Sequence, residues 1–265
     1  MHELALEQRR ALGVRAPWHV GDITWGLRQH EGREDEWTIR LWRDGGRVVA
    51  WSWLKADRGL LEHDVLPDHR HLLDEILDVP EARAASAFDD DEETLAALAR
   101  HGFTTPGGAM HFNARDVSEP PAQRPVPDGF RLRTVEPEDL AERVEIHRDV
   151  WAPSRVTQTS YANVTASWPY RASLDCVAEA PDGRFAAYVL VWPDDENRVA
   201  LFEPVGTREE FRRRSLGAAV CTFALRRLYE EGMRQAIVLC QRDSACALYE
   251  SVGFRRVGTN VTYER

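Results

Sequence analysis

A basic turn that contains small residues carries the clearest chemistry in this 265-residue chain. Residues 211–219 read FRRRSLGAA, follow the apolar run Val199–Phe202 and open an apolar pattern of helical period. The first N–H groups of a helix have no partner within it, and the helix dipole favours negative charge there. Arginines add charge-assisted hydrogen bonds, and small residues let the backbone approach closely. The turn therefore predicts a pyrophosphate site, with a solvated basic turn as the alternative.

A second motif follows this turn after the length of one helix and one strand. Residues 245–254 carry the pattern A-x-x-L-Y-x-x-x-G-F, and residues 212–217 carry R-x-x-S-x-G. Together they resemble the GNAT superfamily of acyl-CoA-dependent N-acyltransferases, which has glycine where this chain has Ser215. The resemblance covers residues 129–265 strongly and the first half faintly. It implies that acetyl-CoA is the acyl-donor substrate.

The resemblance also implies which residues hold the acyl donor. The backbone of residues 205–207 is expected to pair with the pantetheine arm, and Gly206 to permit close approach. The expected contacts are Val205, Gly206, Thr207, Arg212, Arg213, Arg214, Ser215, Leu216, Gly217, Ala218, Arg242 and Ala245. Arg242 stands where many relatives have asparagine. A positive φ at Ser215 would cost about 1–2 kcal/mol, unless the hydroxyl offsets it by donating to a phosphate.

Two residues are expected to be catalytic. Tyr249 resembles the family tyrosine that protonates the departing thiolate, and its alternative role is to pack a helix against the sheet. An amine with a pKa of about 10 must lose a proton before it attacks. Glu203, on the strand beside the proposed thioester, is the expected base, working through water. Its alternatives are to face solvent or to bind an arginine.

An aromatic segment between residues 151 and 171 is the expected acceptor site. Aromatic walls with a few polar groups suit a small molecule. The alternative is that these aromatic side chains pack against the first half of the chain. The candidate residues are Trp151, Arg155, Tyr161, Trp168 and Tyr170, with Arg155 or Arg171 available for a substrate carboxylate.

A proline-rich segment divides the chain. Four prolines in residues 118–129 predict an extended linker. The halves on either side resemble one another: residues 97–103 read ALARHGF, and residues 248–254 read LYESVGF. We therefore expect an internal duplication, with residues 1–117 as a degenerate GNAT-like domain and residues 130–265 as the acetyl-CoA-binding domain. The first copy has no glycine after Arg70 and carries two acids there, which would repel a phosphate.

Periodicity gives the expected elements of the second half. Helices are predicted over residues 136–151, 216–228 and 244–252, the last capped by Asp243 or Ser244, with Gly232 as a C-cap of the second. Strands are predicted over residues 130–133, 175–179, 185–192, 199–205 and 236–240, and two more end the chain. The fold class is α/β: two tandem domains, each a mixed, mostly antiparallel sheet flanked by helices.

Composition narrows the function further. A formal net charge of −10 disfavours a general nucleic-acid or membrane-surface binder. No apolar run is long enough for a membrane span and no signal region is evident, so we expect a cytoplasmic location. Cys176, Cys221, Cys240 and Cys246 lack C-x-x-C spacing and are expected to be reduced core thiols. The histidines at 63, 69 and 71 match no zinc pattern, so no metal is expected.

These observations predict an N-acetyltransferase that acts on the amine of a small molecule by direct attack. A non-catalytic acyl-CoA sensor is the alternative. A P-loop nucleotide hydrolase is excluded because G-x-x-x-x-G-K-[ST] is absent. The sequence leaves the acceptor, the acyl chain length and the oligomeric state open.

Overall fold

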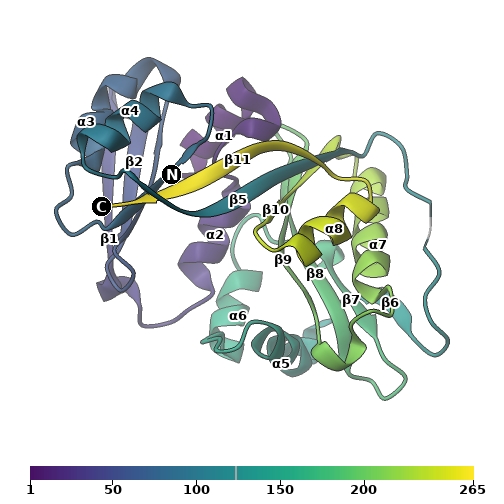
Figure 1. Ribbon diagram of the computed structural model, residues 1–265. Helices are drawn as coiled ribbons and strands as arrows, with labels where there is room; N and C mark the ends of the chain where they lie inside the picture. The colour runs from purple at the N-terminus through teal and green to yellow at the C-terminus, as the bar shows by residue number, and fades with distance from the viewer. Residues whose placement is uncertain (123) are drawn as a thin grey trace. The chain divides into compact units, whose positions relative to one another are not determined.

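The computed structural model describes residues 1–122 and 124–265 (Figure 1). The chain forms two compact units: residues 1–19, 32–112 and 256–265 make the first, and residues 20–31 and 113–255 the second. That residues 1–117 and 130–265 form two separate domains stays a prediction. The compact units differ from it in three segments: residues 20–31 and 113–117 belong to the second unit, and residues 256–265 belong to the first. Residue 123 of the predicted linker lies outside the described residues.

The first unit is a mixed sheet with helices. Its strands lie in the order β1-β2-β3-β4-β11-β5, with β3 and β4 parallel and the pairs β1–β2, β2–β3 and β4–β11 antiparallel. Its elements are α1 (His2–Leu12), β1 (Trp37–Asp44), β2 (Arg47–Lys55), β3 (Leu60–Val65), α3 (Leu73–Leu77), β4 (Ala84–Phe88), α4 (Glu92–Arg100), residues 105–112 of β5 (Thr105–Asp116) and residues 256–264 of β11 (Arg255–Glu264).

The second unit continues from residue 113 of β5 in the order β5-β10-β9-β8-β7-β6. Its strands are β6 (Arg131–Thr134), β7 (Asp175–Glu179), β8 (Phe185–Asp194), β9 (Val199–Thr207) and β10 (Gln235–Cys240). Its helices are α2 (Val20–Arg28), α5 (Leu140–Val150), α6 (Gln158–Thr165), α7 (Leu216–Glu230) and α8 (Asp243–Ser251).

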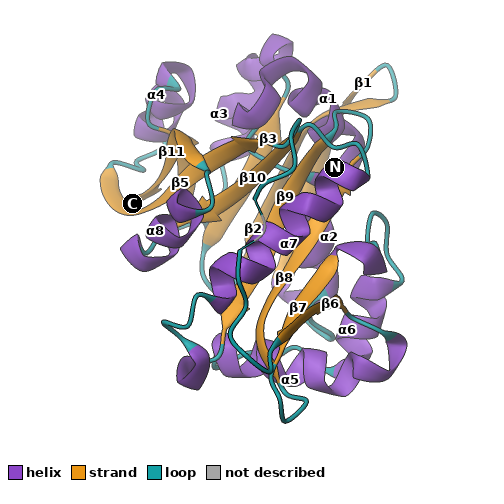
Figure 2. Ribbon diagram, turned by 90° about the vertical axis from the view of Figure 1, so that its right-hand side faces the viewer, coloured by secondary structure: helices purple, strands orange, loops and turns teal. Residues whose placement is uncertain are grey.

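Helices cover both faces of this second sheet. Figure 2 shows α7 lying across its strands, where Leu216, Val220 and Ala224 pack on Cys176 and Ala178 of β7. Ile146 of α5 packs on the opposite face against Val177 and Tyr188. Because both faces are covered, all residues of β7 and β8 are buried, which explains their nearly continuous apolar sequence.

Most predicted elements of the second half are confirmed, including β7 at its predicted bounds. Gly232 follows α7 with a φ of 79°, as a helix-ending glycine requires. Two expectations are wrong. One strand, β11, ends the chain instead of two, and α8 has no side-chain cap at either Asp243 or Ser244. Among the described residues no helix is long and apolar enough to cross a membrane.

Candidate functional site

Strands β9 and β10 part in the middle of the second sheet. Their parallel pairing runs from Val199↔Gln235 to Phe202↔Val238 and stops there. β9 continues to Thr207, paired on its other edge with β8. Residues 204–207 of β9 lie beyond this pairing, so within the described ranges β10 does not cover their edge of the strand. Main-chain donors and acceptors on such an edge can pair with an extended ligand.

The basic turn lies where β9 leads into α7. Arg212, Arg213, Arg214 and Ser215 are all exposed, and α7 begins at Leu216. Its N-terminus has no side-chain cap and no acidic residue in its first turn. The first N–H groups of this helix are therefore left for a partner outside the protein. Three neighbouring guanidinium groups and an uncapped helix terminus make the turn suitable for a diphosphate.

Ser215 adopts the left-handed backbone conformation, in which a non-glycine residue is strained. Its φ is 62° and its ψ is 8°, and Arg213 has a φ of 60°. A non-glycine residue in this region is strained by its own Cβ. The R-x-x-S-x-G loop therefore holds two strained residues, which is a pattern found at ligand-binding loops.

Gly217 is required by close packing and not by an unusual φ. A Cβ there would lie 3.2 Å from Thr207 Oγ1 and 3.4 Å from Leu248 Cδ2. The first turn of α7 is thus held against the end of β9 and against α8. The close contact keeps the helix terminus and the open edge of β9 in one place.

Tyr249 projects from α8 and is 6 % exposed. Burial is the main reason why its pKa is raised well above 10, and the charge of Glu203 adds to the effect. A tyrosine hydroxyl is protonated at neutral pH even at its ordinary pKa, and the upward shift makes this one a weaker acid. Its role as proton donor to the thiolate stays a prediction. Its ring centroid lies 6.0 Å from that of Phe254, so the packing role suggested for this tyrosine is also present.

Glu203 lies half-buried at the point where β9 and β10 separate. Its backbone carbonyl accepts a 2.6 Å hydrogen bond from Trp192 Nε1. Trp192 was not predicted to contact the site, because the sequence placed it only within a strand.

Gly206 is needed for a reason that differs from the expected one. A Cβ at this position would lie 2.6 Å from Val150 Cγ1 and 2.8 Å from Tyr188 Cε1. The space beside Gly206 is therefore filled by protein side chains. Close approach of a ligand to its main chain stays a prediction.

Cys240 and Cys246 form a disulfide that joins the end of β10 to α8, so the prediction of a reduced thiol is wrong for both. Cys176 and Cys221 are free and buried, as predicted. The disulfide anchors the helix that carries Tyr249. Two more of the predicted donor contacts lie inside the loop that the disulfide closes: Arg242 is exposed immediately before α8, and Ala245 is half-buried within α8. Of the others, Val205 is half-buried on β9 and Ala218 is buried in the first turn of α7.

The candidate acceptor residues separate into three environments. Trp151 is 50 % exposed, and its Nε1 donates to Tyr188 Oη at 2.8 Å. Arg155 is exposed on the α5–α6 connection. Tyr161 is 1 % exposed and donates to Asp175, so it is a core residue.

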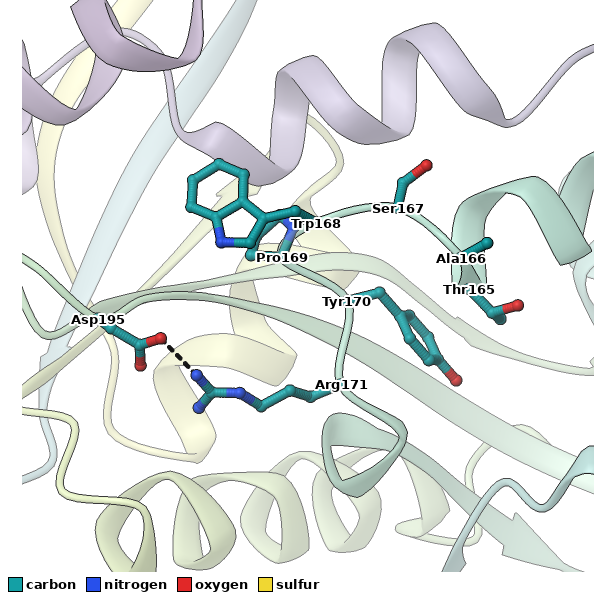
Figure 3. A pocket seen from close by; sticks show the side chains of 8 residues that line it. All are labelled: Thr165, Ala166, Ser167, Trp168, Pro169, Tyr170, Arg171 and Asp195. Carbon is teal, nitrogen blue, oxygen red and sulfur yellow. Dashed lines mark hydrogen bonds and ion pairs between the residues drawn. The ribbon is translucent and has the colours of Figure 1, made fainter.

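Trp168 and Tyr170 line a cavity with a volume of about 220 Å³ (Figure 3). The α6–β7 connection forms most of it, and the turn after β8 completes it. The lining residues are Thr165, Ala166, Ser167, Trp168, Pro169, Tyr170, Arg171 and Asp195.

A buried polar cluster next to Trp151 was not predicted from the sequence. Arg143 is fully buried, with Nε 2.9 Å from Asp175 Oδ1 and its guanidinium 4.0 Å from the centre of the Tyr188 ring. His147 Nδ1 lies 2.8 Å from Tyr188 Oη. Burial and the nearby Arg143 charge lower the pKa of His147 to about 3, so this imidazole is neutral. The available signal was the charged residues within otherwise apolar helix and strand patterns.

The equivalent turn of the first unit is built differently. Arg70 is bound by Asp91 through two hydrogen bonds of 2.5 and 2.9 Å. The helix that follows, α3, has five residues and carries Asp74 and Glu75 in its first turn. A phosphate there would meet carboxylates instead of exposed guanidinium groups. Among the described residues, no group of three or more metal-ligating side chains occurs.

Comparison with known proteins places this geometry in context. Residues 142–254 match the acetyltransferase (GNAT) family. The chain is 26 % identical over 227 residues to a mycothiol acetyltransferase of Saccharomonospora viridis, spanning 78 % of this chain and 74 % of that protein.

Solved structures share the fold of the whole chain. A GCN5-related N-acetyltransferase from Sphaerobacter thermophilus aligns with a TM-score of 0.69 at 18 % identity, covering 100 % of this chain and 90 % of that one. A tandem GNAT protein from the clavulanic acid biosynthesis pathway aligns with a TM-score of 0.68 at 17 % identity, covering 99 % and 95 %. These similarities confirm the predicted fold class.

Proposed function

We propose, starting from the GNAT acetyltransferase domain that residues 142–254 form, that this acyl-CoA-dependent N-acetyltransferase moves an acetyl group from acetyl-CoA to the amine of a small molecule. The observation that carries the proposal is the coincidence of three features in one region. The open edge of β9, the uncapped N-terminus of α7 and the protonated Tyr249 suit the pantetheine, the diphosphate and the leaving thiolate respectively. The similarity to a mycothiol acetyltransferase supports acetyl transfer but does not fix the acceptor.

The proposed reaction is a direct attack. Glu203, acting through a water molecule, removes a proton from the ammonium group, and the amine nitrogen then attacks the thioester carbonyl. A backbone N–H on the open edge of β9 stabilises the tetrahedral oxyanion. The carbon–sulfur bond breaks, and Tyr249 protonates the departing thiolate. The products are an amide and free coenzyme A.

The proposal assigns donor binding to only one of the two copies. Residues 130–265 would bind the donor, and residues 1–117 would be a degenerate copy without a donor site. The Arg70–Asp91 pair and the short α3 support this reading. Calorimetry should then show one acetyl-CoA bound per chain, and two bound molecules would contradict it.

The alternative is a non-catalytic acyl-CoA sensor. Release of free thiol from acetyl-CoA in the presence of an amine panel separates the two functions. The enzyme releases coenzyme A only with particular amines. A chain that binds acetyl-CoA in calorimetry yet releases no thiol with any amine would be a sensor.

Ser215→Gly is expected to tighten acetyl-CoA binding by up to about tenfold. Glycine adopts a φ of 62° without the Cβ penalty of about 1–2 kcal/mol. Titration calorimetry measures the change, and Ser215→Ala is the matched control because it keeps the strain and removes the hydroxyl. Weaker binding by the glycine variant would show that the hydroxyl contacts a phosphate and outweighs the strain.

Glu203→Gln is expected to lower kcat/KM by about 10²-fold near pH 7 and by progressively less toward pH 10. Below the amine's pKa of about 10, the fraction present as the reactive free base falls tenfold for each pH unit. A catalytic base therefore matters most at low pH. A pH–rate series of coenzyme A release measures the effect, with the exposed Glu230→Gln on α7 as control. A profile parallel to that of the unmodified protein would exclude the base role.

A further inference from the structure

Three arginines meet at the C-terminal end of α8. Arg124 Nη2 donates to the carbonyl of Ser251, and Arg255 Nη1 donates to a carbonyl that follows it by three residues. The guanidinium of Arg115, near the end of β5, lies against Gly253: a Cβ there would be 2.8 Å from Nη1 and 3.1 Å from Cζ of this arginine. All three side chains belong to the second unit. The end of α8 is therefore surrounded by three cations.

Helix capping explains two of these arginines and leaves the third. A cation near the last carbonyls of a helix is favourable, because these carbonyls carry the negative end of the helix dipole. Arg124 and Arg255 donate to carbonyls in this way. The guanidinium of Arg115 makes no hydrogen bond or ion pair within the part of the chain that the structure describes. Its partner is therefore solvent or a bound anion.

The charges around Arg115 are unbalanced. Burial, followed by the charges of Arg124 and Arg255, lowers the pKa of Arg115. Glu250 is the one acid on the last turn of α8, and over the described residues its carboxylate forms no ion pair. Arg133, in contrast, is bound by two carboxylates. An anion at the end of α8 would relieve the repulsion between the three cations.

This arginine cluster lies close to the predicted diphosphate site. A Cβ at Gly217, in the first turn of α7, would lie 3.4 Å from Leu248 Cδ2. Ser251 follows Leu248 by three residues, about 4.5 Å along α8 at the usual rise per residue, and its carbonyl binds Arg124. Residues 212–215 and Ser251 are all exposed, so both places are at the surface. A ligand held at the start of α7 can therefore reach the arginines by passing Leu248.

The segment that carries Arg124 also reaches the predicted diphosphate site. Phe130, six residues after Arg124, packs edge-on against Phe211 with ring centroids 5.8 Å apart. Phe211 directly precedes the three arginines of the basic turn, and the guanidinium of Arg214 lies 5.8 Å from the centre of its ring. One end of this segment is thus held at α8 and the other at the basic turn.

Coenzyme A carries a second phosphate group that suits such a cluster. Besides the diphosphate, its ribose bears a 3′-phosphate, and a phosphate monoester holds close to two negative charges at neutral pH. Guanidinium groups bind it through charge-assisted hydrogen bonds. Arg115 and Arg124 lie outside residues 142–254, which match the acetyltransferase family, and Arg255 immediately follows them. The cluster is therefore not part of the family match.

We propose that Arg115, Arg124 and Arg255 form a second phosphate site, which binds the 3′-phosphate of the acetyl-CoA donor while the turn at residues 212–215 binds the diphosphate. The proposal rests on the proposed function, because it assumes that acetyl-CoA is the donor. It adds specificity to that function: the chain distinguishes coenzyme A thioesters from thioesters that lack this phosphate.

Acetyl-CoA and 3′-dephospho-acetyl-CoA differ only in this phosphate and test the proposal. In titration calorimetry at low ionic strength, the unmodified protein is expected to bind acetyl-CoA about tenfold more tightly, as for a hydrogen-bonded charge. Arg115→Gln should weaken acetyl-CoA binding about threefold and leave binding of the dephospho donor unchanged. The combined variant Arg115→Gln, Arg124→Gln and Arg255→Gln should bind both donors equally. The control Arg40→Gln removes an exposed charge of the first unit and should keep the tenfold preference.

The dephospho donor also reports on the fold of α8. If the combined variant distorts the helix, both donors bind more weakly, and Arg115→Gln alone then decides, because it leaves the two capping arginines in place. Equal weakening of both donors by Arg115→Gln would overturn the proposal. A tenfold preference that survives the combined variant would do the same. Equal affinity of the unmodified protein for the two donors, with binding of inorganic phosphate that depends on Arg115, would assign the cluster to a free phosphate ion instead.

Failure of the proposed acetyltransferase function is recognised separately. A preference for acetyl-CoA that depends on Arg115, without release of coenzyme A to any amine, supports the phosphate site and rejects catalysis. If acetyl-CoA does not bind, adenosine 3′,5′-bisphosphate and adenosine 5′-monophosphate repeat the comparison. Binding of the bisphosphate that depends on Arg115 would keep a phosphate site and reject its assignment to the donor. Binding of neither nucleotide would reject both.

Discussion

Replacing Tyr249 with Phe is expected to lower kcat by about 10²–10⁴-fold, the usual contribution of a positioned proton donor, with little change in KM for acetyl-CoA. A tyrosine hydroxyl is protonated at neutral pH at its ordinary pKa of about 10, and burial raises the pKa of Tyr249 further. Only the leaving thiolate needs that proton, so the loss should appear in kcat and not in donor binding. Steady-state measurement of coenzyme A release with saturating donor checks the result.

The same substitution also serves as a control for the packing role of Tyr249. Phenylalanine keeps the ring that meets Phe254, so the thermal midpoint should stay close to that of the unmodified protein. Tyr229→Phe, on the exposed side of α7, provides a matched loss of one hydroxyl. If turnover and the thermal midpoint of the Tyr249 variant are both unchanged, the tyrosine has only the packing role. The non-catalytic acyl-CoA sensor would then be the better-supported function.

The sequence predicted the second unit well where local signals agree. β7 and β8 are runs of apolar residues around a Pro-Asp-Gly turn, and α7 has an apolar stripe that stops at Gly232. The exposed basic turn before α7 was also predictable, because arginines and small residues in one short segment need no distant partner to be recognised. Donor binding by this turn stays a prediction. The positive φ of Ser215 agrees with the glycine that the family pattern has at this place.

Non-local pairing explains what the sequence did not reveal. Residues 260–264 of β11 pair with residues 84–88 of β4, so the end of the chain completes the first unit. No periodicity carries a register between segments so far apart. The Arg143–Asp175 pair also joins segments that are well separated in sequence. The Cys240–Cys246 disulfide is close in sequence, but its formation depends on how β10 turns into α8.

Removing the three charges of the donor loop is expected to weaken acetyl-CoA binding by up to about 100-fold. In the triple variant Arg212→Ala, Arg213→Ala and Arg214→Ala, each lost contact with the diphosphate should cost up to about fivefold, which is the range for exposed charge pairs. The backbone N–H groups at the start of α7 remain, so binding should be weakened and not abolished. Calorimetry at low ionic strength measures the change.

Ionic strength distinguishes a charge effect from a damaged loop. Near 1 M salt the screening length falls to about 3 Å, so the unmodified protein should lose affinity and approach the triple variant. The control Arg10→Ala, Arg40→Ala and Arg43→Ala changes the net charge of the protein equally on exposed side chains of the first unit. It should bind acetyl-CoA normally if the local turn, and not the overall field, attracts the diphosphate. A difference between the unmodified protein and the loop variant that persists in high salt would mean that the loop has changed shape. Equal affinity of the two at low salt would place the diphosphate elsewhere and would remove the observation on which the proposed function rests.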